Sequence, residues 1–143
     1  MVDYRDWGVP LGRRFRALKL WFVIRAYGIE KLRAMLREHI ALAKELASQI
    51  QAAPDFELTT PPSLALLTFR YRPPGLDEPA LDALNERLLH ALNDSGRVYL
   101  TQTRTRGRYV IRFAIGQRTT TRRHVQAAWQ LIQQTARSLS DPE

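Results

Sequence analysis

Arg112 is the residue of this chain best placed to do chemistry, because it interrupts an otherwise apolar stretch at residues 108–115. A buried or half-buried charge has to be paired or hydrogen-bonded. The planar guanidinium presents a fork of donors that suits a carboxylate. The pattern therefore leaves two readings for Arg112: a binding residue for an anionic group, or one half of a structural ion pair.

The other reactive residue types suggest no site of their own. His39, His90 and His124 share no metal-ligand spacing, so we expect packing roles for them and no metal site. The chain has no Cys, which excludes disulfides and thiolate metal ligands. The three threonines at residues 119–121 have arginines nearby and suggest either an anion site at a helix N-terminus or, by default, an ordinary helix cap.

Hydrophobic periodicity predicts the elements that hold these residues. Helices are expected at residues 12–27, 30–52 and 78–93, and a last one starts near residue 120. Strands are expected at residues 55–58, 64–71, 97–104 and 108–115, with turns at 60–63 and 105–107. This order predicts an α+β fold: N-terminal helices followed by a small antiparallel sheet of about four strands, covered by helices.

The first predicted helix is apolar nearly all round. A helix of this kind is normally buried on several sides rather than laid on a surface. Trp7, Trp21 and Phe22 are large apolar groups that need a neighbour to cover them. We therefore expect the isolated chain to aggregate or to form oligomers.

Composition fits one domain with a real core, since 45% of the 143 residues are hydrophobic. The chain has neither an apolar run of about 18 residues nor a basic-then-apolar leader, so we expect no membrane span and a cytoplasmic location. The net charge of +8 raises the possibility of nucleic-acid binding. The basic residues are spread along the chain rather than gathered in one tract, so a nucleic-acid partner is not our expectation.

Residues 3–23, DYRDWGVPLGRRFRALKLWFV, are dense in arginine and aromatic residues. They resemble the signature DY-x-x-W-x-(I/V)-P-L-x-R-R-F-R of the pyridoxal-phosphate group II decarboxylases, the aromatic L-amino-acid decarboxylase family. The resemblance continues in order along nearly the whole chain: residues 55–57 with 64–70, the strand GRYVIRFAIG at 107–116, and HVQAAW at 124–129. The strand motifs are weak individually, but the opening signature is specific.

This resemblance implies a fold-type-I enzyme in which a large domain holds pyridoxal phosphate on a lysine that follows a histidine. The small C-terminal domain closes one side of the cleft. No lysine here follows a histidine, because Lys19, Lys31 and Lys44 follow Leu, Glu and Ala. There is no Gly-rich phosphate loop either. We therefore expect pyridoxal phosphate in the complete enzyme, but no cofactor-binding and no catalytic residue in this chain alone.

The resemblance also implies three residues of a substrate cleft: Gly12, Arg14 and Arg112. Gly12 matches the family position that faces the substrate side chain, where a glycine leaves room for an aromatic ring. An equally good interpretation is a glycine that is merely tolerated near the start of a helix. Arg14 could pair a carboxylate that lines the cleft, or form a solvated or structural ion pair. The family places an active-site arginine at the position of Arg112.

The sequence thus predicts the C-terminal portion of a decarboxylase (a lyase) that converts an aromatic L-amino acid to its amine and CO2, and that is inactive alone. It would be a subunit of a split enzyme, a truncated remnant or an excised piece. Residues 1–28 would pack on the missing large domain and residues 29–143 would form the small domain. The partner would be a pyridoxal-phosphate-binding large domain on a separate chain, or copies of the chain in a homo-oligomer. The alternative is a stand-alone basic α+β module that binds RNA or an acidic protein.

Overall fold

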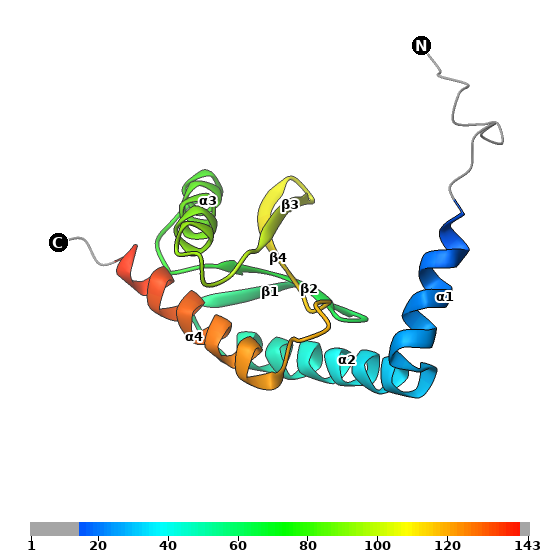
Figure 1. The fold of residues 1–143 in the computed structure, drawn as a ribbon. Coiled ribbons are helices and arrows are strands. Elements are labelled where there is room, and N and C mark those ends of the chain that lie inside the picture. Colours follow the sequence, from blue (N-terminus) through cyan, green and yellow to red (C-terminus); the bar gives the residue numbers. More distant parts are fainter. Residues whose placement is uncertain (1–14, 141–143) are drawn as a thin grey trace, which may run out of the picture. The chain divides into compact units, whose positions relative to one another are not determined.

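The structure, a computed structural model, describes residues 15–140. Gly12 and Arg14 lie outside the described residues. The element order is α1 (Arg16–Tyr27), α2 (Ile29–Ala52), β1 (Phe56–Ser63), β2 (Leu66–Tyr71), α3 (Glu78–Asp94), β3 (Thr101–Thr105), β4 (Arg108–Ala114) and α4 (Arg122–Ser138) (Figure 1). The chain divides into two compact units, residues 1–34 and 35–143.

The described part of the first unit is α1 and the first turns of α2. Gly28 separates the two helices with a φ of +77°, a backbone conformation that side chains other than glycine rarely adopt. α1 has no buried residue. Trp21 is 54% exposed and Phe22 57% exposed. Within the described residues this helix is therefore exposed, and its expected burial against a large domain stays a prediction.

The second unit is built on a four-stranded antiparallel sheet with the strand order β1-β2-β4-β3. Helices and antiparallel strands occupy separate layers, which confirms the predicted α+β fold. The turn between β3 and β4 has two residues, Arg106 and Gly107, with φ of +52° and +81°. Two positive φ values in a two-residue loop match the right-handed twist of the strands, as in type I′ hairpins.

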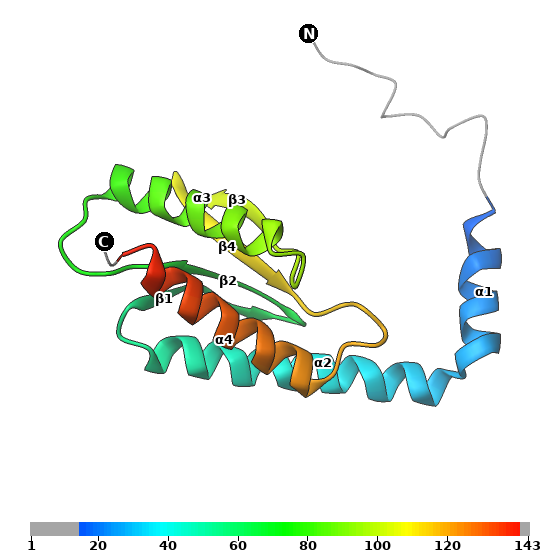
Figure 2. The same ribbon diagram turned by 60° about the vertical axis from the view of Figure 1, so that its left-hand side comes forward.

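Figure 2 shows α2, α3 and α4 along the sheet. Their apolar residues share one core with alternate residues of the strands. On β4 these core residues are Tyr109, Ile111 and Phe113, as the alternation predicts. Trp129 of α4 lies at the centre, with ring centroids 4.8 Å from Phe56. The predicted core role of Trp129 is confirmed, and the intervening strand positions belong to the opposite face of the sheet.

The prediction of a turn at residues 60–63 is wrong. β1 continues through Pro61 and Pro62 to Ser63, and the chain reverses at Leu64, which has a φ of +53°. β1 is an edge strand, so a proline that lacks an N–H does not break a ladder on that side. The register of β1 against β2 shifts between Leu58 and Thr60 and again before Ser63, which accommodates the prolines.

Within residues 15–140, no helix is both long and apolar enough to cross a membrane. No group of three or more His, Asp or Glu residues in that range could hold a metal ion. His39 is 2% exposed, and it lies on the part of α2 that contributes to the core.

Candidate functional site

Arg112 lies on β4, half-buried, on the face of the sheet opposite the shared apolar core. The strand register sets its neighbours. Arg112 is directly opposite Thr68 on β2 and Thr101 on β3. Directly opposed residues of an antiparallel pair share one face of the sheet. Threonine is therefore the neighbour of Arg112 on both adjoining strands.

The Thr68 hydroxyl extends this polar surface to the edge strand. It lies 2.6 Å from the Thr59 hydroxyl and 2.7 Å from the Thr60 hydroxyl. Thr68 is 7% exposed, so the contact is sheltered from water. We call Arg112 with Thr59, Thr60, Thr68 and Thr101 the Arg112 strip.

Arg112 differs from the other arginines of the sheet in its partners. Arg70, Arg104 and Arg108 each have at least one carboxylate within salt-bridge distance. Among residues 15–140, by contrast, no carboxylate oxygen lies within 4.0 Å of the Arg112 guanidinium. The structural ion pair that sequence reasoning held open for Arg112 is thus absent from the described part of the chain.

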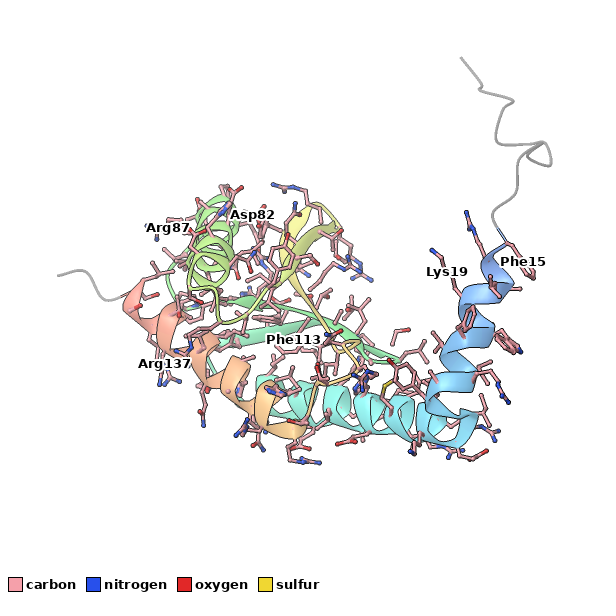
Figure 3. All side chains as sticks on the ribbon, viewed as in Figure 1. Phe15, Lys19, Asp82, Arg87, Phe113 and Arg137 are labelled. Atoms are coloured by element: carbon pink, nitrogen blue, oxygen red, sulfur yellow. The ribbon has the colours of Figure 1, made fainter. Side chains whose placement is uncertain are left out.

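The paired arginines belong to a carboxylate network, which we define as Arg70, Arg104 and Arg108 with Glu57, Glu78 and Asp82. The fully buried Arg70 donates to Glu78 Oε2 (2.7 Å) and Asp82 Oδ1 (2.9 Å). Arg104 donates to the second oxygen of Asp82 (3.0 Å). Figure 3 shows Asp82 on α3, on the side toward β3.

The network sits where the sheet opens. The β2–β4 ladder ends at Phe69 and Ile111. Beyond that point the N–H of Tyr109 donates to Asp82 Oδ1 (2.9 Å), and Asn85 bonds both the N–H and the carbonyl of Tyr71 at 2.8 Å. Side chains of α3 thereby satisfy backbone groups that would otherwise be unpaired in the interior. The role of this network is structural.

Two pKa shifts follow from these contacts. The hydrogen bond from Arg70 holds the pKa of the Glu78 carboxyl below its ordinary value of 4.5. Burial raises the pKa of the Tyr109 phenol above 10.0, and the nearby Glu86 charge acts in the same direction.

The threonines at residues 119–121 form an ordinary cap. Thr121 is the N-cap of α4, and its N–H donates to Nδ1 of His124 (3.1 Å). His124 also lines a cavity of about 300 Å³ between residues 97–100, the end of β4 and the start of α4. Arg112 does not line this cavity. Arg97 and Thr120 also line it.

The lysines do not fit a pyridoxal phosphate site. Lys19 lies on α1, and Lys31 and Lys44 lie on α2; all three are exposed. A Schiff-base lysine needs an enclosed site that shields the cofactor and tunes its electronics. The described residues offer no such place, so no reaction step can be assigned to the cofactor on this chain.

Sequence reasoning found Arg112 but missed the threonines around it and the buried Arg70. Arg70 carried the same signal as Arg112, a charge inside an apolar strand. Its partners were also visible as acidic residues four apart, Glu78 and Asp82, at the start of a helix. The threonine contacts depend on strand register, which the sequence did not fix.

Known proteins are similar to this chain in sequence and in fold. Residues 1–72 match the pyridoxal-dependent decarboxylase conserved domain. The chain is 46% identical over 136 residues to phenylacetaldehyde synthase of Arabidopsis thaliana, covering 95% of this chain and 28% of that protein. It is 43% identical over 145 residues to tyrosine decarboxylase 4 of Petroselinum crispum, covering 99% of this chain and 28% of that protein.

A solved structure gives the same result. The crystal structure of Oryza sativa TDC with PLP and tryptamine superposes with a TM-score of 0.83 and 37% identity, covering 97% of this chain and 30% of that one. The chain therefore spans 28% of the length of both curated relatives and has the fold of the matching part of a solved relative.

Proposed function

The chain belongs to the pyridoxal-dependent decarboxylase family, and on that premise we propose that it is the C-terminal part of an enzyme acting on aromatic L-amino acids. The reaction would be loss of CO2 from the amino acid to give its amine. In the complete enzyme, pyridoxal phosphate supplies the electron sink for that step. The cofactor and its lysine would come from a large domain outside this chain.

The role of this chain would be to form one wall of the substrate cleft. The observation that carries this proposal is the state of Arg112: half-buried, placed on the sheet face opposite the apolar core, and without a carboxylate among the described residues. A charge in that position is compensated when another molecule or domain covers it. Gly12 and Arg14 would line the same cleft.

The exposed apolar side chains of α1 support a large-domain partner. Trp21, Phe22 and their neighbours are exposed on every side of this helix. An exposed apolar surface of this kind marks a protein–protein contact. Residues 1–28 would pack on the large domain, either on a separate chain or within a homo-oligomer. The assembly would be cytoplasmic.

Purification from the native host tests the proposal. The protein that contains this chain should co-purify with, or be continuous with, a polypeptide from which alkali releases pyridoxal phosphate. The preparation should release CO2 from L-tyrosine, L-tryptophan or L-phenylalanine. A cofactor-free preparation without such a polypeptide would contradict the proposal.

Substitution in α1 sharpens this test. Trp21→Ser should reduce co-purification of the large domain, because it removes a large exposed apolar group from the proposed contact. Leu76→Ser is the matched control: Leu76 is also exposed, at 43%, and lies in the loop before α3. If both variants recover equal amounts of the large domain, α1 is not part of the contact.

The structure does not favour the alternative of an RNA-binding module. Three of the four arginines on the sheet are engaged with carboxylates. Such arginines are not available for phosphates. An affinity of the chain for RNA that falls steeply with added salt would support this alternative.

A further inference from the structure

We propose that the cavity at the start of α4 is a binding site for a small monocarboxylate with an apolar tail. The cavity, of about 300 Å³, lies between residues 97–100, the end of β4 and the first turns of α4. It is on the core face of the sheet, whereas Arg112 belongs to the opposite face of β4. The inference goes beyond the proposed function and does not rest on it.

The floor of the cavity suits an apolar tail. Its volume of about 300 Å³ is at the lower end of the range of small-molecule sites, roughly 300–1,000 Å³. A single ring or a short branched chain therefore matches it, and burial of that group removes apolar surface from water. The side chains of the floor all belong to the shared core or pack against it: Leu100, Phe113, Ile115, Val125, Ala128 and Leu131.

The walls of the cavity are held in place by hydrogen bonds within the chain. Asn93 binds both backbone groups of Leu100: its Oδ1 accepts from the Leu100 N–H (2.8 Å), and its Nδ2 donates to the Leu100 carbonyl (3.0 Å). On the other wall, the N–H of Ile115 donates to the carbonyl of Ala65 (2.9 Å). These segments are therefore ordered before a ligand enters, and binding does not have to order them.

The charge at the cavity selects an anion. Among the described residues, Arg97 lines the cavity and no Asp or Glu does. None of the ion pairs within residues 15–140 involves Arg97. The fork of a guanidinium fits the two oxygens of a carboxylate. An ammonium group would find no counter-charge here, so the site favours an acid without an amino group over an amino acid or an amine.

His124 supplies a second donor. The N–H of Thr121 donates to Nδ1 of His124 (3.1 Å), and a ring nitrogen that accepts a backbone hydrogen bond carries no proton. The proton of the neutral ring is therefore on Nε2, which has no hydrogen-bond partner among residues 15–140. The cap of α4 thus fixes the tautomer of a cavity-lining histidine in the form whose Nε2–H donates to a carboxylate.

The test uses the full 143-residue chain with 3-phenylpropionate as the probe, at constant pH and ionic strength. The methyl NMR signals of Ile115 and Val125 should shift saturably. Those of Leu76, exposed in the loop before α3, should not. 3-Phenylpropanol lacks the negative charge and L-phenylalanine adds an ammonium group, so both should bind about fivefold more weakly, as expected for the loss of an ion pair at the edge of a cavity.

Two pairs of variants separate the charge of the site from its volume. Arg97→Gln should weaken binding of 3-phenylpropionate about fivefold and leave that of 3-phenylpropanol unchanged. Arg123→Gln is the matched control, since Arg123 is exposed in the first turn of α4 and does not line the cavity. Ala127→Leu fills the cavity from its exposed side and should abolish saturable binding of both probes. Gln130→Leu, on the same helix but outside the cavity, should not.

Three results would overturn the proposal. Linear shifts at Val125 like those at Leu76 would show adventitious apolar association. Equal affinities for 3-phenylpropionate and 3-phenylpropanol would show that the carboxylate is not recognised. Binding to the chain that is lost in the assembled enzyme would mean that a side chain of the large domain occupies the cavity. The measurements on the chain need no cofactor and no large domain, so failure of the site leaves the proposed function standing, and failure of the function leaves the site standing.

Discussion

The two ends of the sheet use arginine in opposite ways. At the end where β2 and β4 separate, the buried Arg70 is held by Glu78 and Asp82, and Arg104 and Arg108 also have carboxylate partners. Around Arg112 the neighbouring strands present threonine hydroxyls. A charge inside an apolar strand therefore does not by itself mark a functional residue. The distinguishing feature is whether the residues between 15 and 140 supply its counter-charge.

The largest effect on stability should come from Asp82. Its carboxylate accepts hydrogen bonds from Arg70 on β2, Arg104 on β3 and the N–H of Tyr109 on β4. Asp82→Ala should lower the free energy of unfolding by about 3 kcal/mol, because the fully buried Arg70 loses one of its two carboxylates. Chemical denaturation of the chain measures this. Glu86→Ala, on the exposed side of the same helix, is the control and should change stability by less than about 0.5 kcal/mol. Equal losses would show that the network is not the source of stability.

Asn85 should come next. Asn85→Ala should cost about 2 kcal/mol of unfolding free energy, since it leaves the buried N–H and carbonyl of Tyr71 without partners. Amide hydrogen exchange should show Tyr71 losing protection before the centre of β2. Retained protection at Tyr71 would mean that another group or water replaces the asparagine.

A pH dependence should follow from Glu78 and affect the same end of the sheet. Its pKa is below the ordinary value of 4.5 in the folded chain, so its contribution to stability is fully present above pH 4.5. The contribution is lost as the pH falls through the folded-state pKa. Glu78→Gln should therefore flatten the fall in unfolding free energy below pH 4.5. An unchanged slope would show that the bond to Arg70 does not contribute.

The smallest effect on stability should come from Arg112. Arg112→Gln should change the unfolding free energy by less than about 0.5 kcal/mol, because no carboxylate of the described chain is left unpaired. Arg70→Gln is the matched variant at the other end of the sheet and should cost several times more. A large loss of stability in Arg112→Gln would make Arg112 a structural residue like Arg70.

Much of this arrangement could be predicted from sequence, and the misses have physical causes. The core residues of α3 and β4 were predicted correctly from the spacing of the leucines in α3 and the alternation of apolar residues in β4, since hydrophobic periodicity directly reflects burial. Pro61 and Pro62 led to the wrong prediction of a turn at residues 60–63, because an edge strand tolerates prolines that a central strand would not. Trp21 indicated burial by its residue type, although its cover is not among the described residues of this chain.

The candidate site could be predicted only in part, for a similar reason. Arg112 stood out by type within one strand, whereas its neighbours Thr68 and Thr101 come from other strands. Pairing between distant segments depends on register, and register is fixed by tertiary structure. Gly12 and Arg14 were singled out by family resemblance, lie outside the described residues, and stay predictions.

The proposed role of Arg112 in the cleft is tested by decarboxylation in the assembled enzyme carrying Arg112→Gln, compared with Arg106→Gln in the β3–β4 turn. We expect normal assembly and stability for both variants, and at least a tenfold lower kcat/KM for an aromatic L-amino acid in Arg112→Gln alone. Unchanged kcat/KM in a properly assembled Arg112→Gln enzyme would mean that Arg112 is not part of the substrate cleft.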